Sequence, residues 1–171
     1  WATANANEIC RLLFVNKMDH EQADAVERIG PLLARLDAKG VHLQLPIGAG
    51  TEFKGVVDLP SMKAYLYEGS SGKFSEAEIP ADLREAAEDM RRQLMDSVAE
   101  ADDGFLEKYL DGGEFSLEEL KQTIRKATRQ RKIFPILYGS ATHFIGIPQL
   151  LEAVLDYLPA PPEEADLEGT N

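Results

Sequence analysis

The chain has 171 residues, of which 44% are hydrophobic and 28% are charged, and its net charge is -12. This composition indicates a globular fold with a substantial core. The negative charge argues against an extended phosphate-binding surface, so no direct DNA binding is expected. No stretch approaches the roughly 20 apolar residues of a membrane span, and the single cysteine, Cys10, favours a cytoplasmic location. The chain begins at Trp1 without a methionine, so we expect an excised part of a longer protein.

In chain order, the first half is predicted to contain a strand, a helix and a group of short strands. A strand over 11–15 precedes a helix over 22–38, which Gly30-Pro31 should kink or split and Gly40 should end. Turn residues then separate three β-like runs. We expect these runs to form an antiparallel meander over residues 42–47, 53–58 and 62–67.

The second half is predicted to be mainly helical. A long amphipathic helix over 82–101 has Asp82 and Glu85 as a possible capping pair, and Ser116 with Glu119 forms a capping box at the start of a later helix. Further elements are a helix over 105–110, a buried strand over 133–138 and a last helix over 147–158. Residues 161–171 are interpreted as a linker or tail.

The tetrapeptide Asn16-Lys17-Met18-Asp19 directly follows the first strand. A carboxylate accepts two parallel hydrogen bonds and so matches the N1 and 2-amino donors of guanine, whereas adenine has an acceptor at N1. Asp19 would therefore select the base. Lys17 can lay its stem along a purine face, and Asn16 can fix neighbouring loops. The alternative is an ordinary strand end that turns into a polar loop.

A second motif, Gly139-Ser140-Ala141, follows the predicted strand over 133–138. If the two strands are parallel neighbours, both motifs lie at the same edge of the sheet, where one ligand can contact both. Ser140 and Ala141 would bring backbone N–H groups close to guanine O6. By itself Gly-Ser-Ala is only a turn, but the two motifs together favour guanine binding.

Six phrases of the chain resemble the translational GTPases, and within them the elongation factor G type. In chain order they are Phe14-Val15-Asn16-Lys17-Met18-Asp19, Gln44-Leu45-Pro46-Ile47-Gly48, Phe53-Lys54-Gly55-Val56-Val57-Asp58-Leu59, Glu107-Lys108-Tyr109-Leu110, Gly139-Ser140-Ala141 and Asp156-Tyr157-Leu158-Pro159. The resemblance implies an α/β fold: part of a P-loop-type G domain, with parallel strands and flanking helices, plus an inserted α+β subdomain with a small antiparallel sheet and acidic helices.

The implied domains are the C-terminal half of the G domain, formed by 1–41 and 131–160, and an insert over 42–130. Spacing supports the insert, because a strand-helix-strand unit needs about 30 residues whereas Asp19 and Ser140 are 121 apart. Residues 76–119 hold 15 acidic and four basic residues. The resemblance gives this acidic region a partner, the C-terminal domain of the ribosomal stalk protein, and the alternative is a solvated helical face.

For function, the resemblance implies GTP or GDP as ligand and GTP hydrolysis on the ribosome by the longer parent. No phosphate loop of the Gly-x4-Gly-Lys-Ser/Thr type occurs in the chain, and Gly69-Ser70-Ser71-Gly72-Lys73-Phe74 is interpreted as a hairpin turn. The Mg²⁺ ligands and the catalytic histidine are expected upstream. No catalytic residue and no metal site are assigned here, since His20, His42 and His143 lack metal-ligand spacing.

Two departures from the family pattern leave alternatives open. His20 stands where the family usually has arginine, and Thr142-His143-Phe144-Ile145 replaces the usual residues after Gly-Ser-Ala. An elongation factor G-like paralogue, a ribosomal protection protein or peptide-chain release factor 3 remain alternatives. So does a non-catalytic interaction module that binds the stalk protein and keeps only a vestigial guanine site.

Overall fold

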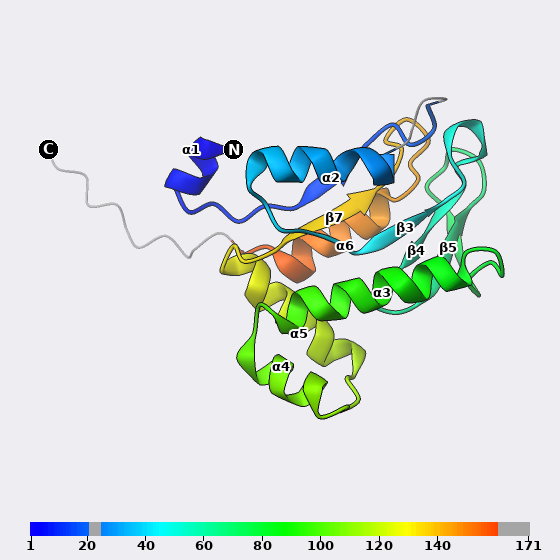
Figure 1. The fold of residues 1–171 in the computed structure, drawn as a ribbon. Coiled ribbons are helices and arrows are strands. Elements are labelled where there is room, and N and C mark those ends of the chain that lie inside the picture. The colour runs from blue at the N-terminus through cyan, green and yellow to red at the C-terminus, as the bar shows by residue number, and fades with distance from the viewer. Residues whose placement is uncertain (21–24, 161–171) are drawn as a thin grey trace, which may run out of the picture.

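A parallel sheet of three strands lies at the centre of the computed structural model, which describes residues 1–20 and 25–160. Its order is β1 (Leu13–Val15), β7 (Phe134–Tyr138) and β2 (Gly40–His42), and both outer strands run parallel to β7. All five residues of β7 are buried, as expected for a central strand with both faces covered. Figure 1 shows this sheet between helices.

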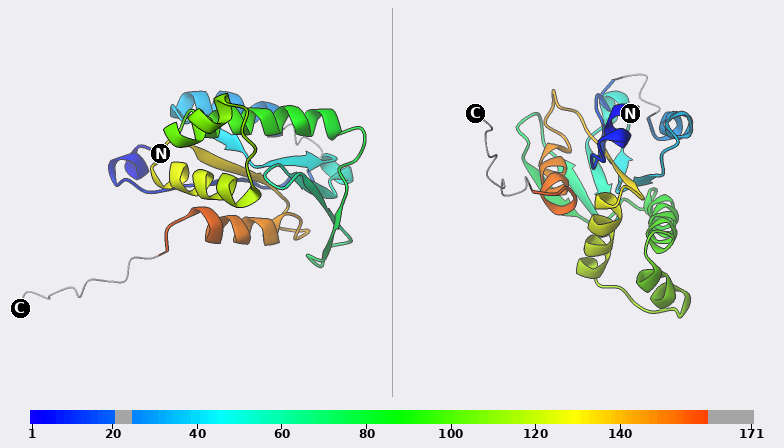
Figure 2. Two further views of the ribbon diagram at one scale, coloured as in Figure 1. Left: turned by 90° about the horizontal axis from the view of Figure 1, so that it is seen from below. Right: turned by 90° about the vertical axis from the view of Figure 1, so that its left-hand side faces the viewer.

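Helices cover both faces of the parallel sheet. The helix α2 (Ala25–Leu36) lies on one side together with α3 (Arg84–Ala99), and α6 (Ile147–Tyr157) lies on the other, as both views of Figure 2 show. A short helix, α1 (Ala2–Ala6), precedes β1 and was not predicted. In the described residues, no helix has the length and apolar character needed to cross a membrane.

A separate antiparallel sheet follows β2 in the chain. Its four strands pair in chain order, and the turn between the first two contains the short 3-10 helix η1 (Gly50–Glu52). The strands are β3 (Gln44–Ile47), β4 (Gly55–Asp58), β5 (Lys63–Tyr67) and β6 (Phe74–Ala77). The predicted α/β fold with a parallel sheet, flanking helices and a small antiparallel sheet is thus confirmed.

Two strand predictions need correction. The run over 42–47 is not one strand, because His42 ends β2 of the parallel sheet and Gln44 begins β3 of the antiparallel sheet. The residue between them, Leu43, donates its N–H to Ile136 O at 3.0 Å and so still follows β7. The fourth strand, β6, was missed because three of its four residues are exposed and carry no apolar alternation.

The helix predictions are largely confirmed. The capping box is present, with Glu119 N donating to Ser116 Oγ at 3.1 Å and Ser116 N donating to Glu119 Oε2 at 2.8 Å, and it opens α5 (Leu117–Arg129). Before α5 lies α4 (Asp103–Leu110), which Asp102 caps. The predicted capping pair of Asp82 and Glu85 is wrong, since α3 begins after Leu83 without a side-chain cap.

The helix α2 also differs from expectation. It continues as one element through Pro31 and ends at Leu36, so Gly30-Pro31 does not split it. Gly40 begins β2 instead of ending the helix. A β-carbon at Gly40 would lie 2.5 Å from Leu33 Cδ1 and 2.8 Å from Ile136 Cδ1. A larger residue there would have to move the ends of the Leu33 and Ile136 side chains, which pack between α2 and the sheet.

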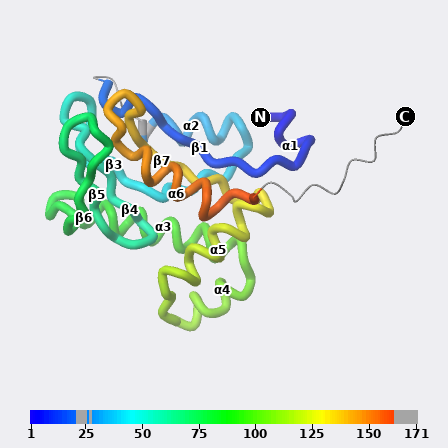
Figure 3. Tube along the Cα trace, turned by 180° about the vertical axis from the view of Figure 1, so that it is seen from behind, coloured from blue at the N-terminus to red at the C-terminus, as the bar shows by residue number. Residues whose placement is uncertain are grey.

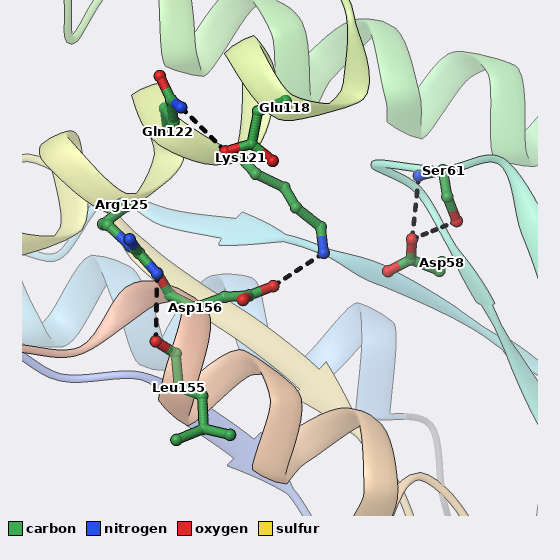
Figure 4. A network of polar contacts seen from close by, with 8 residues as sticks. All are labelled: Asp58, Ser61, Glu118, Lys121, Gln122, Arg125, Leu155 and Asp156. Carbon is green, nitrogen blue, oxygen red and sulfur yellow. Dashed lines mark hydrogen bonds and ion pairs between the residues drawn. The ribbon is translucent and has the colours of Figure 1, made fainter.

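The parts that hold the two sheets pack against each other. One cluster of buried apolar side chains includes Val41 of β2, Val57 of β4 and Leu94 of α3, so it joins the parallel sheet to the antiparallel sheet and to α3. Polar contacts add to this packing: Lys121 Nζ of α5 lies 2.8 Å from Asp156 Oδ2 of α6, as Figure 4 shows. The division into 1–41 with 131–160 and 42–130 stays a prediction, and residues 161–171 lie outside the described residues.

Candidate functional site

The two sequence motifs meet at one edge of the parallel sheet. Val15 of β1 and Tyr138 of β7 are partners in the parallel register, so the segments after both strands leave the sheet at the same end. Gly139 N donates to Val15 O at 3.0 Å, and Met18 N donates to Gly139 O at 3.1 Å. The predicted proximity of the motifs is therefore present, and Figure 3 shows the segments after β1 and β7 beside each other at this end.

Asn16 links the two motifs directly. Its Oδ1 accepts hydrogen bonds from Lys17 N at 2.8 Å and from Ala141 N at 2.9 Å. An amide oxygen has two lone pairs, and both are used here to hold backbone N–H groups, one of them from a residue 125 positions away in sequence. Asn16 therefore fixes the loop after β1 against the loop after β7, as predicted from its residue type.

The side chains of Lys17 and Met18 differ in burial. Lys17 is exposed and adopts a left-handed backbone conformation with φ of 63°. Met18 is only 1% exposed and packs in a cluster with Ile29 and Tyr138. The peptide oxygen of Met18 accepts from Gly50 N at 3.0 Å. The buried methionine therefore fixes the loop to the core, while the lysine stem is left available to a ligand.

Asp19 is a partly buried carboxylate whose side chain is 28% exposed. The pKa of Asp19 is lowered, mainly by hydrogen bonding with the Ser140 side chain, although burial acts in the opposite direction; His143 and His20 lower it further. The carboxylate is thus ionised at neutral pH, in the form that accepts two hydrogen bonds. Its Oδ1 is buried and has no hydrogen-bond partner among the described residues.

Ser140 and Ala141 use their backbone N–H groups within the chain. Ser140 is fully buried and donates its N–H to Ile145 O at 2.9 Å, while the Ala141 N–H goes to Asn16. A guanine O6 could therefore reach the Ala141 N–H only by sharing it with Asn16. The assignment of these two residues to O6 stays a prediction.

The structure adds His143 to this site, although the sequence pattern indicates only ordinary polar surface there. His143 Nε2 lies 3.5 Å from Asp19 Oδ2, and its Nδ1 lies 3.1 Å from Ser70 Oγ in the β5–β6 turn. The sequence feature that could have identified His143 is its position two residues after Ala141. Its partner Ser70 could not have been found, since it lies 73 residues away in sequence.

The glycine-rich segment 69–74 does not form a phosphate loop. It connects two antiparallel strands, β5 and β6, with Gly69 at φ of 65° and Gly72 at φ of 73°. The prediction of a hairpin turn is confirmed. Within residues 1–20 and 25–160, no group of three or more histidine, cysteine or acidic side chains is arranged to hold a metal ion.

Comparison with known proteins agrees with this geometry. The family model described as the elongation factor Tu GTP binding domain matches residues 1–160. The fold is similar to the crystal structure of ttk003000868 from Thermus thermophilus, with a TM-score of 0.83 and 32% sequence identity. The match covers 95% of this chain and 24% of that chain, so this chain spans about a quarter of that protein. The chain belongs to the elongation factor Tu GTP-binding domain family of translational GTPases.

Proposed function

We propose that this chain is the guanine-recognising part of a ribosome-dependent translational GTPase of the elongation factor G type, which acts in the cytoplasm at the translocation step of protein synthesis. The observation that carries the proposal is the junction of the two motifs, in which Asn16 Oδ1 binds the N–H of Ala141 at 2.9 Å. This contact joins the segment that carries Asp19 to the segment that carries Ser140, at the end of the sheet where α/β folds bind their ligands.

Each polar residue at this edge has a role in base recognition. Asp19 is ionised and would accept from guanine N1 and the 2-amino group, which adenine cannot offer together. Lys17 would lay its methylene stem along the purine face. Asn16 holds the loop in place and does not itself read the base. The ligand that this arrangement fits is GTP or GDP.

We further propose that the phosphate groups, Mg²⁺ and the hydrolytic step depend on residues of the longer protein. Two charge-assisted hydrogen bonds contribute roughly 1.5 to 3 kcal/mol each, while immobilising a ligand costs at least about 4 kcal/mol. The 171 residues by themselves are therefore expected to bind GTP only in the millimolar range or more weakly, and not to hydrolyse it. Calorimetric titration of GTP into this chain and into the full-length protein tests the proposal. Micromolar binding of GTP by this chain alone would overturn it.

A second proposed role concerns a partner protein. The acidic side chains Glu85, Glu88 and Asp89 of α3 are exposed, and of these Asp89 pairs with Arg92 of the same helix. The basic residues of α5 and the turn after it are instead engaged within the chain, where they bind carboxylates or peptide oxygens. These residues are Lys121, Arg125, Lys126, Arg129, Arg131 and Lys132. The acidic excess of residues 76–119 favours a basic partner, for which we propose the ribosomal stalk protein.

Charge reversal on α3 tests this partner. We expect lysine at Glu85, Glu88 and Asp89 together to weaken binding of the stalk protein C-terminal domain by more than about tenfold at low salt, because close charge pairs steer and stabilise such complexes. Fluorescence anisotropy with labelled stalk domain measures the effect. Stalk binding that survives the reversal would show that this face is not the docking surface.

A further inference from the structure

The imidazole of His143 lies between the base-selecting carboxylate and the antiparallel sheet. Its Nε2 is 3.5 Å from Asp19 Oδ2, and its Nδ1 is 3.1 Å from Ser70 Oγ. The backbone of the same residue is fixed too, since His143 N donates to Ser140 Oγ at 3.3 Å. One side chain thus bridges the segment after β1 and the β5–β6 turn.

The chemistry of this bridge depends on protonation. In the neutral ring, an Nε2–H directed at Asp19 leaves Nδ1 as an acceptor for the Ser70 hydroxyl. In the imidazolium form both nitrogens carry protons, and the positive charge faces the Asp19 carboxylate. In both forms Nε2 carries a proton that faces Asp19.

His143 contacts the Asp19 carboxylate, which is the group proposed to bind guanine. Two parallel hydrogen bonds from a guanine edge require both oxygens of Asp19. However, Oδ1 has no exposed surface, and Oδ2 faces His143. A base that approaches Oδ2 therefore meets the imidazole of His143.

We propose that His143 is a gating residue for guanine recognition: it competes with the base for Asp19, and its displacement breaks the contact with Ser70. The inference rests on the proposed function and deepens it. The half-exposed pair of Asp19 and His143 sets the size of the effect, since exposed ion pairs change an equilibrium by about two- to fivefold.

The bridge also couples the base site to the β5–β6 turn. Phe144 follows His143 with φ of 57°, and its Cβ would lie 3.4 Å from a β-carbon at Gly72 of that turn. The turn itself is closed by Glu68 N donating to Lys73 O at 3.4 Å. When guanine moves His143, the turn loses the Ser70 contact and opens more readily.

Among residues 1–20 and 25–160, few other charged groups act on this pair. His20 is exposed on the same segment as Asp19 and also lowers the pKa of that carboxylate. On the β5–β6 turn, Glu68 and Lys73 are exposed. His20 therefore offers a matched control, because it carries the same imidazole side chain near Asp19 and no contact to Ser70 is present in the described residues.

The test measures GDP affinity of the full-length protein for wild type, His143→Ala and His20→Gln at one pH. We expect His143→Ala to bind GDP about two- to fivefold more tightly than wild type. His20→Gln should stay within about twofold of wild type.

Hydrogen exchange tests the coupling to the turn. GDP should accelerate amide exchange over residues 68–73 in wild type, whereas in His143→Ala this exchange is already fast and does not respond. Equal or weaker GDP binding by His143→Ala would overturn the gate while leaving the proposed function intact. If the wild-type protein does not bind GDP at all, the proposed function fails as well, so the two failures are distinguishable.

Discussion

Replacement of Asp19 by asparagine in the full-length protein is expected to lower GDP affinity by at least about a hundredfold and to raise affinity for the corresponding xanthine nucleotide. The asparagine amide offers one donor and one acceptor, so it keeps one match to guanine and sets a donor against the 2-amino group. Xanthine has an oxygen at that position and accepts the new donor. The change therefore reverses base preference and does not simply abolish binding.

Competition titration with GDP and XDP measures this reversal. A matched control is Asp37→Asn, which makes the same substitution at a residue with φ of 48° in the turn between α2 and β2. Asparagine tolerates this backbone conformation well, so Asp37→Asn should leave both affinities unchanged. Unaltered base preference in Asp19→Asn would show that Asp19 does not read the base.

The second large effect is expected for Gly139→Ala, which should lower the free energy of unfolding by about 3 kcal/mol. A β-carbon at Gly139 would lie 2.4 Å from Ile145 O and 2.6 Å from Phe14 Cζ. The oxygen belongs to the backbone that pairs Ser140 with Ile145, so relief of the clash must move the loop after β7. The same movement would separate Ala141 from Asn16, and GDP affinity should fall together with stability.

Urea unfolding of the wild type and of Gly139→Ala gives the change in the free energy of unfolding, with Gly104→Ala as the control. Gly104 is exposed in the first turn of α4, and a β-carbon there would lie 3.5 Å from Asp102 Oδ1, an ordinary contact. The same substitution should therefore stabilise the protein, by about 0.5 to 1 kcal/mol. Equal effects of the two substitutions would mean that the surroundings of Gly139 leave room for a β-carbon.

The sequence predicted those parts of the fold that local chemistry decides. The capping box of Ser116 and Glu119 was found because both hydrogen bonds form within one helical turn. The division of residues 42–47 between two sheets was not predicted. It depends on the hydrogen bond that Leu43 N donates to Ile136 O, and Ile136 is far away in sequence. The strand β6 is similar, since its exposed residues become a strand only by pairing with β5.

The same distinction applies to the candidate site. Asp19 and Ser140 were brought together by a general property of parallel strands, whose carboxyl ends share one edge of a sheet. His143 was missed because its importance comes from Ser70, which the fold of the antiparallel sheet brings to it. The sequence also gave no signal for the role of Met18, which is buried and fixes the loop that holds Asp19.

The most direct measurement of base recognition is a side-by-side calorimetric titration of the full-length wild-type protein with GDP and ADP. The phosphates of the two ligands are identical, so the difference in affinity reports the base only. We predict that GDP binds at least about a hundredfold more tightly, since the Asp19 carboxylate gains two charge-assisted hydrogen bonds from guanine and none of that kind from adenine. Equal affinities for GDP and ADP would contradict the role of Asp19 as the base-selecting residue.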